Sequence, residues 1–383
     1  MLVVDPATAV GGRVRTELHE GFQLDRGFQL FNPAYPEPPR LLDLPALELC
    51  SFTPGALVVS RGRRHRLVDP RREPKGIPGL LSPRLGTLRE QAALIALSAR
   101  NGYGPKSALL AGETTTAQSL REWGLTGDLG ERLLRRFLAG VFLERELSTS
   151  SVFFNLVWRT FVRGTPAVPS HGMRAIPEQL AAGLPAGTVW LRERVDTVEP
   201  YAARLADGRG IEATRGVVVA TDGAAAAQLV PSLATPVMHG VTTIYHRPPT
   251  APIDEPILVL DGDEELVVNT VLMSAAAPSY APPGQHLVAT SVLGVGHGAD
   301  LEQRVRERLA VLYGVDTAAW RHLRTYEIPG ALPAMPPPLD LRKPVHIRDG
   351  VFVCGDHRDS SSIQGAMVSG RRAAEAVLAR AAR

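Results

Sequence analysis

Two segments near the C-terminal end of the chain carry the clearest chemistry. The apolar run Gly350 to Val353 leads into Cys354, Gly355 and Asp356, and Ser362 to Gly370 then opens an amphipathic helix. The first N–H groups of a helix lack partners within it, and the helix dipole adds partial positive charge there. A carboxylate such as Asp356 can cap a helix, or it can accept hydrogen bonds from sugar-alcohol hydroxyls. The combination suits a nucleotide-like polyol that carries an electron-accepting ring.

The start of the chain offers a matching half. Residues Met1 to Val4 form a short apolar run that ends at Asp5. In doubly wound nucleotide-binding folds, an acidic residue at the tip of the second strand binds the ribose hydroxyls of adenosine. Gly11 and Gly12 lack a Cβ atom, so their backbone can approach a phosphate closely, and Arg13 adds a permanent positive charge. Alone, this Gly-Gly-Arg run would indicate only a turn.

Together these segments resemble the superfamily of FAD-dependent amine oxidases, protoporphyrinogen oxidases and phytoene desaturases. Each matching piece is weak, but their order and spacing are specific, and they extend over nearly the whole chain. The resemblance implies an α/β fold, with a Rossmann-like FAD-binding domain and an inserted α+β substrate domain. The pieces are Asp5 to Thr16, Asp25 to Gln29, Val168 to Met173, Val195 to Thr221, and Gly355 to Gly370.

The resemblance implies which residues bind the sugars and phosphates of FAD. Asp5 would bind the adenosine ribose, and Val195 would pair with adenine through its backbone. Gly355 and Asp356 would hold a phosphate and the ribityl chain. The residues expected along the pyrophosphate and the ribityl chain are Gly11, Gly12 and Arg13.

It also implies which residues surround the flavin ring. Gly27, Phe28 and Gln29 would lie beside the ring. The helix that begins near Ile363 would stabilise negative charge on the pyrimidine side. No cysteine lies in the segment ahead of this helix, so FAD is expected to bind there without a covalent bond. The residues expected to face the pyrimidine end are Gln364, Gly365 and Ala366.

One departure from the family pattern concerns the residues before Met1. The family begins with a strand, a Gly-x-Gly-x-x-Gly turn and a helix, about 30 residues in length, and here the match starts after that unit. Without it we expect poor FAD binding and two unpaired strand edges. The start codon could be internal to a longer reading frame, a separate chain could supply the unit, or the protein could have lost its cofactor. We favour the first explanation, because Met1 falls inside a strand.

Composition limits the remaining function classes. The chain has 383 residues, of which 44% are hydrophobic and 21% charged, with a net charge of +3. A substantial core and two domains are expected, and the scattered arginines give little support to nucleic-acid binding. Cys50 and Cys354 indicate neither a disulfide framework nor a metal site, so we expect no metal and a cytoplasmic location. No run reaches the roughly 18 to 20 apolar residues of a membrane span, but peripheral membrane contact stays open.

Hydrophobic periodicity predicts how the chain divides. Residues 1–75, 169–236 and 340–383 are assigned to the FAD-binding domain, and 76–168 and 237–339 to the substrate domain. From Leu80 to Phe161, including Leu85, apolar residues recur at helical spacing. Val189 to Ala213 resembles a meander with a turn at Asp207 and Gly208. Gly216 to Thr221 is a continuous apolar run, typical of a parallel strand covered on both faces.

These features favour hydride transfer from an apolar small molecule to flavin, as in a desaturase or dehydrogenase. Such a reaction needs positioning and water exclusion more than a strong protein base, and no catalytic residue can be identified. Amine oxidation is an alternative, although Asp359 to Gln364 contains no aromatic residue for an amine cage. A cofactor-free relic that acts as a binding or scaffold protein is another. His171 and His357 flank the cofactor motifs and could contact a ligand or only the backbone. The oligomeric state is not predicted.

Overall fold

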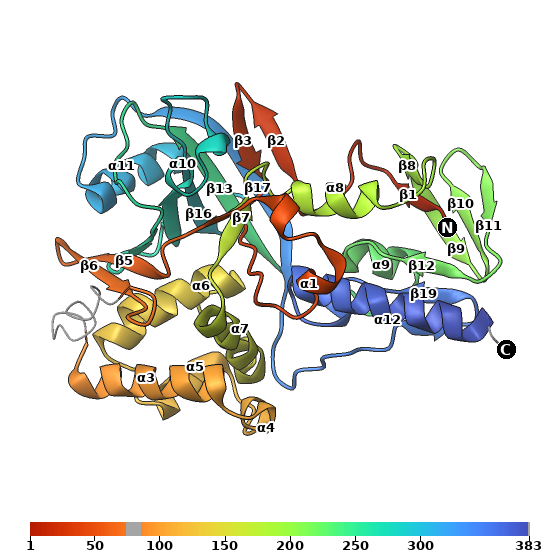
Figure 1. Ribbon diagram of the computed structural model, residues 1–383, viewed down its shortest axis with the longest axis horizontal. Helices are drawn as coiled ribbons and strands as arrows, with labels where there is room; N and C mark the ends of the chain where they lie inside the picture. The colour runs from red at the N-terminus through yellow and green to blue at the C-terminus, as the bar shows by residue number, and fades with distance from the viewer. Residues whose placement is uncertain (74–85, 382–383) are drawn as a thin grey trace.

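The computed structural model describes residues 1–73 and 86–381 of the chain and has a mixed α/β architecture (Figure 1). Strands that resemble a nucleotide-binding sheet lie on the right in Figure 1, and a larger sheet and a group of helices lie on the left. The predicted boundary between residues 75 and 76 lies outside the described residues. So do Leu80 and Leu85 of the predicted helical pattern.

The nucleotide-binding part contains two groups of parallel strands. Strand β1 (Val3–Asp5) pairs with β8 (Val189–Leu191), and β12 (Val217–Val219) pairs with β19 (Val351–Val353). Strand β18 (His346–Arg348) runs antiparallel to β19. Within the described residues β1, β8, β12 and β18 each have a single partner strand. The accompanying helices are α8 (Ala175–Ala182), α9 (Gly223–Leu229) and α12 (Ile363–Ala381).

Two details of this part differ from the sequence-based prediction. The run Val189 to Leu191 does not join the meander but pairs with β1. The run Gly216 to Thr221 is not covered on both faces, because Val218 is 40% exposed while Val219 is buried. The meander itself is confirmed, with the predicted turn at Gly208, whose φ is +88°. Its strands are β9 (Val195–Glu199), β10 (Ala202–Leu205) and β11 (Gly210–Glu212).

A seven-stranded sheet dominates the other half of the molecule. Its first four strands in order are β17 (Arg321–Pro333), β13 (Met238–Arg247), β16 (Val288–Leu293) and β15 (Asn269–Leu272), and the remaining three are β14 (Leu258–Asp261), β5 (Gly55–Ser60) and β6 (Arg63–Val68). Helix α11 (Leu301–Tyr313) packs its apolar face against this sheet. The β5–β6 hairpin corrects our assignment of residues 1–75, because β5 pairs in parallel with β14 across about 200 residues of chain.

The chain between Leu88 and Arg163 is mainly helical. Thr87 and Glu90 form a capping box at the start of the first of these helices, and Ser150 caps the last. Their apolar faces pack together around Leu97, Leu138 and Phe154, each fully buried. The elements are α3 (Leu88–Tyr103), α4 (Lys106–Leu110), α5 (Thr116–Glu122), η3 (Leu129–Arg135), α6 (Arg136–Phe142) and α7 (Ser151–Arg163).

Short elements connect the two halves. Strand β4 (Leu49–Ser51) pairs with β7 (Ala167–Pro169), and β2 (Thr16–His19) pairs with β3 (Phe22–Asp25). One apolar cluster of buried side chains extends from β3 to strands β13 and β16 of the large sheet. The other short elements are α1 (Pro38–Leu41), η1 (Pro45–Leu47), α10 (Met273–Ala276), η4 (Pro278–Tyr280) and η5 (Asp356–Arg358).

Over residues 1–73 and 86–381, no helix combines the length and the apolar character that crossing a bilayer requires.

Candidate cofactor site

The two ends of the chain meet at one ion pair. Nη2 of Arg13 lies 2.6 Å from Oδ1 of Asp356, and Nη1 of Arg13 donates to the carbonyl oxygen of Ala331 at 2.8 Å. The Asp356 side chain is 6% exposed, whereas the Arg13 side chain is 33% exposed. The arginine therefore neutralises a buried carboxylate and still has donor groups that can reach a ligand.

The turn before Arg13 requires its two glycines for different reasons. Gly11 has a φ of +112°, and a Cβ atom there would lie 2.3 Å from the carbonyl oxygen of Val14. Gly12 has a φ of +58°, but a Cβ atom there would meet nothing within 4 Å. Gly11 is thus fixed by the turn itself, while the backbone at Gly12 faces open space that a ligand could use.

Helix α12 is tied to the end of strand β19 by a serine. Oγ of Ser369 accepts a hydrogen bond from N of Gly355 at 2.9 Å and donates to O of Gly355 at 2.8 Å. Gly355 has a φ of +145°, and a Cβ atom there would lie 2.6 Å from the ring of His357. The sharp turn between β19 and α12 therefore depends on glycine, and it brings Asp356 beside the helix start.

His357 is the most informative side chain that sequence reasoning left undecided. The residue is 5% exposed, and neither ring nitrogen has a hydrogen-bond partner within the described part of the chain. Burial lowers the pKa of His357, so the ring is neutral at pH 7. A buried imidazole usually has a partner, and an unsatisfied one beside Asp356 fits a site that binds a polar ligand. No spacing in the sequence marks this burial.

The first turn of α12 shows which of its predicted residues have structural roles. Oγ of Ser362 accepts from N of Gly365 at 3.1 Å and so caps the helix. A Cβ atom at Gly365 would lie 1.8 Å from the carbonyl oxygen of Ser360, so packing alone requires this glycine. Oε1 of Gln364 accepts from N of Glu37 at 3.0 Å, and Ala366 is exposed.

The segment Gly27 to Gln29 lies next to the arginine turn. Nε2 of Gln29 donates to the carbonyl oxygens of Arg13 at 2.8 Å and of Arg26 at 2.9 Å. Phe28 and Ile363 are half-buried and pack against the same apolar cluster. Phe28, which follows β3, and Ile363 at the start of α12 thus pack against one apolar cluster, and Phe28 precedes Gln29, which bonds to Arg13.

Asp5 and Val195 occupy the far part of the predicted site. Oδ1 of Asp5 accepts from N of Ala7 at 2.7 Å, and its carbonyl oxygen accepts from N of Glu193 at 3.1 Å. Val195 pairs with Leu205 in the meander. The backbone bond from Glu193 brings the residues just before Val195 to the end of β1. In the described residues no hydrogen bond or ion pair connects Asp5 or Val195 to Arg13 and Asp356.

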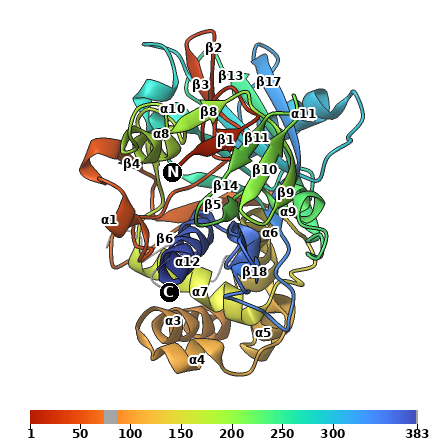
Figure 2. The same cartoon turned by 90° about the vertical axis from the view of Figure 1, so that its right-hand side faces the viewer.

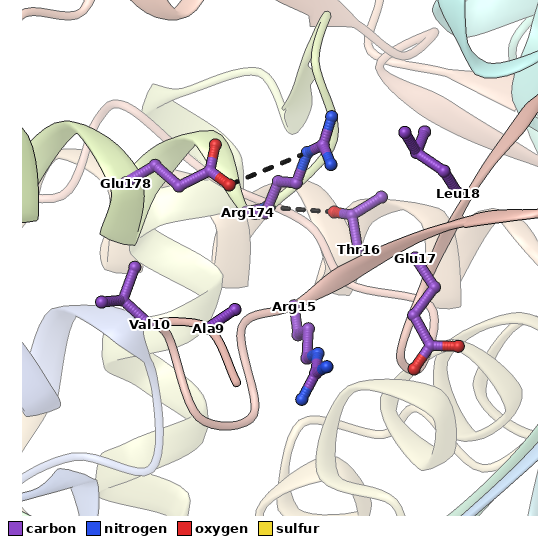
Figure 3. A pocket seen from close by; sticks show the side chains of 8 residues that line it. All are labelled: Ala9, Val10, Arg15, Thr16, Glu17, Leu18, Arg174 and Glu178. Carbon is purple, nitrogen blue, oxygen red and sulfur yellow. Dashed lines mark hydrogen bonds and ion pairs between the residues drawn. The ribbon is translucent and has the colours of Figure 1, made fainter. Parts of the chain in front are cut away.

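A charged hollow lies beside the arginine turn (Figure 3). It has a volume of about 370 Å³ between the Ala9–Leu18 segment and the start of α8. N of Arg174 donates to Oγ1 of Thr16 at 3.0 Å, and the side chain of Arg174 faces Glu178. Sequence reasoning missed Arg174 and Glu178. Because Arg13 and Asp356 do not line this hollow, we place the cofactor site at their ion pair and not here.

A buried carboxylate anchors the segment that leads to Gly27. Asp25 is 1% exposed and accepts hydrogen bonds from Oγ1 of Thr16 at 2.5 Å, N of Met173 at 3.1 Å and the hydroxyl of Tyr280 at 2.8 Å. Burial raises the pKa of Asp25 to about 6, although these hydrogen bonds lower it. Asp25 thus connects β2, β3, the start of α8 and η4 in one network.

These residues fit a flavin nucleotide. Arg13 can neutralise a pyrophosphate, the open backbone at Gly12 permits close approach, and His357 offers ring nitrogens that need a partner. The half-buried Phe28 and Ile363 suit one face of an isoalloxazine ring. When bound, oxidised flavin accepts hydride at N5.

Similarity to known proteins also supports a flavin-binding protein. A family model described as flavin-containing amine oxidoreductase matches residues 1–378. No curated protein matches the chain. An oxidoreductase from Methanosarcina mazei has a similar structure, with a TM-score of 0.73 at 15% identity, over 97% of this chain and 93% of that one.

Two further solved structures share the fold. A protein described as a protoporphyrinogen oxidase from Exiguobacterium sp. 255-15 superimposes with a TM-score of 0.71 at 16% identity, over 98% of this chain and 92% of that one. A triple mutant of putrescine oxidase gives 0.69 at 17% identity, over 99% and 93%. At these identities the similarity shows the fold, while the family model covers almost the whole chain. The chain therefore belongs to the family of flavin-containing amine oxidoreductases.

Proposed function

We propose that this protein is an FAD-dependent oxidoreductase that removes hydride from an apolar small molecule, in the manner of a desaturase or dehydrogenase. The observation that carries this proposal is the ion pair of Arg13 and Asp356. It joins the Gly11–Gly12 turn to η5, ahead of α12, and Phe28 and Ile363 of the adjoining segments pack against one apolar cluster.

In this proposal the protein binds FAD, orients its ring toward the substrate and shields the ring from water. Arg13 holds the phosphates, and Gly355 with Asp356 holds the sugar-alcohol chain. The first turn of α12 places partial positive charge near the ring. One of its N–H groups, that of Gly365, already donates to Ser362. Within residues 1–73 and 86–381 no hydrogen bond uses the N–H groups of Ile363 and Gln364, and these two would face the ring. Phe28 and Ile363 would exclude water from the substrate side.

The aromatic residues near the site favour an apolar substrate over an amine. Tyr245 and Tyr326 form an edge-to-face pair with ring centroids 6.1 Å apart. The guanidinium groups of Arg26 and Arg324 each lie 5.9 Å from the Tyr326 ring centroid, so cations of the protein already use this ring. The Tyr245 hydroxyl donates to O of Asp25. This pair therefore offers little attraction to a substrate ammonium group.

The test is anaerobic reduction of bound flavin. Protein loaded with FAD is mixed with a conjugated polyene, with a porphyrinogen or with putrescine, and bleaching of the oxidised flavin band is followed. We expect the polyene or the porphyrinogen to bleach the band and putrescine to leave it unchanged. Faster bleaching by putrescine would establish amine oxidation instead.

A second experiment measures whether the protein binds FAD at all. The protein is titrated with FAD, and quenching of the flavin fluorescence gives the dissociation constant. We expect FAD to bind, because Arg13 can neutralise its phosphates. If no FAD binds, a binding or scaffold protein is the better account.

A further inference from the structure

Helix α3 presents an apolar face to solvent. Leu88 is 69% exposed, Ile95 51% and Tyr103 68%. These residues are seven and eight positions apart, so they lie on one face of the helix. Alanines fill the positions between them. In Figures 1 and 2, α3 and α4 form the lower edge of the molecule. The exposed residues of this face are Leu88, Arg89, Ala92, Ile95, Ala96, Ala99 and Tyr103.

The opposite face of α3 buries polar side chains. Glu90 is 4% exposed and Asn101 is fully buried. Oε1 of Glu90 accepts from N of Gly127 at 2.8 Å, and Nδ2 of Asn101 donates to Oδ1 of Asn155 at 2.9 Å. If α3 rotated to bury Ile95, both polar side chains would lose these partners, at a high cost. The outward direction of the apolar face is therefore fixed by the fold.

Helix α11 shows the ordinary arrangement in the same protein. Its buried face carries Leu301, Val305 and Leu309. Its exposed residues are Gln303, Arg304, Glu307 and Val311. Helix α11 thus presents mainly charged and polar groups to water, whereas the exposed face of α3 is mainly apolar.

The charged residues near the exposed face of α3 indicate which kind of partner this face could bind. The exposed residues between Thr87 and Gly112 include no carboxylate, and the charged ones are Arg89 and Lys106. Leu110 of the next helix, α4, is also 56% exposed. A second copy of this face would oppose like charges across a two-fold axis. An anionic phospholipid surface supplies both apolar contact and opposite charge.

We propose that the exposed face of α3, together with Leu110, docks the protein on an anionic lipid bilayer. The helix would lie in the interfacial plane, with Leu88 and Ile95 among the acyl chains and with Arg89 and Lys106 at the headgroups. Tyr103 would lie at headgroup depth, because its hydroxyl accepts a hydrogen bond from Arg71 at 2.6 Å and the Arg71 guanidinium lies 5.9 Å from its ring centroid. This docking does not depend on the substrate class. If the proposed function also holds, it would place the enzyme where apolar substrates concentrate.

The test is flotation of the purified protein with vesicles of phosphatidylglycerol and phosphatidylcholine. We expect the protein to float with these vesicles, and Ile95→Glu to lower the bound fraction roughly tenfold, because it places a charge among acyl chains. Val311→Glu on α11 makes the same kind of change at a residue 54% exposed and should bind like the wild type. Pure phosphatidylcholine vesicles should bind less protein than the anionic mixture.

Folding and self-association are checked in parallel. Circular dichroism should be the same for both variants, and Leu88→Ser provides a milder change if Ile95→Glu unfolds. The proposal is overturned if the wild type stays with the soluble fraction at low salt, or if folded Ile95→Glu floats as well as the wild type. It is also overturned if gel filtration shows that Ile95→Glu splits a dimer while vesicle binding is absent, because the face would then be a protein interface.

Discussion

Arg13 and Asp356 are 343 residues apart in the chain and form an ion pair of 2.6 Å. The pair brings the glycine turn near the first strand to the start of the last helix. Because the Asp356 side chain is almost completely buried, Arg13 stabilises its charge, and we propose that Arg13 also binds a phosphate of the cofactor.

Replacing Arg13 with alanine should therefore affect stability and FAD affinity together. We expect a loss of about 2 kcal/mol in the free energy of unfolding, since a buried carboxylate loses its partner. The FAD dissociation constant should rise about tenfold or more. Urea unfolding and quenching of flavin fluorescence measure the two effects. Arg15→Ala in the same segment is the control. The Arg15 guanidinium donates a long hydrogen bond of 3.3 Å to Thr8, so its loss should change both quantities little. Equal effects of both variants would contradict the assignment.

Gly12 permits a test that separates the ligand from the fold. Gly12→Val should weaken FAD binding about tenfold, because the side chain would enter space that we assign to the cofactor. Gly187 has a similar φ of +79°, and a Cβ atom there also meets nothing within 4 Å. Gly187→Val should therefore cost about the same stability, within roughly 0.5 kcal/mol, without loss of FAD. If FAD affinity is unchanged in Gly12→Val, the phosphates do not lie at this turn.

Replacing each of two glycines of α12 with alanine should change the free energy of unfolding in opposite directions. Gly365→Ala should lower the free energy of unfolding by about 2–3 kcal/mol, because its Cβ atom would collide with the carbonyl oxygen of Ser360. Gly370→Ala meets nothing within 4 Å and should raise it by about 0.5–1 kcal/mol through helix propensity. Thermal and urea unfolding measure both. A neutral Gly365→Ala would show that the helix start is looser than described.

Asp25 should make stability depend on pH in a direction that is unusual for a carboxylate. Its folded pKa, about 6, lies above the unfolded value near 3.8. The native state therefore holds the proton longer, and stability falls as pH rises from about 4 to 6. The full effect is about 3 kcal/mol. Asp25→Asn should remove this slope when unfolding is measured at several pH values, whereas the exposed Asp196→Asn should keep it. An unchanged slope in Asp25→Asn would refute the account.

The sequence predicted local elements well where one segment contains the signal. Apolar runs that end at Asp5 and at Asp356, and the helix start at Ile363, are visible in the chain and are present in the structure. The pairing of β5 with β14 was missed, because no local pattern reports a parallel partner about 200 residues away. The resemblance to a known family placed Arg13 and Asp356 along the same cofactor, but their direct ion pair was not predicted.

The roles of some site residues could not be predicted for a related reason. Gly365 matched a cofactor motif, but only coordinates show that the backbone of Ser360 already requires glycine there. The burial of His357 and the network around Asp25 depend on which distant elements surround them. Such surroundings are tertiary information that composition and periodicity do not contain.

The most direct measurement is a crystal structure of the protein with FAD bound. The account predicts the phosphates and the sugar-alcohol chain within hydrogen-bond distance of Arg13, Gly12 and Gly355, and the ring against Phe28 and Ile363. Flavin density elsewhere, with the Arg13–Asp356 pair untouched by the cofactor, would contradict it.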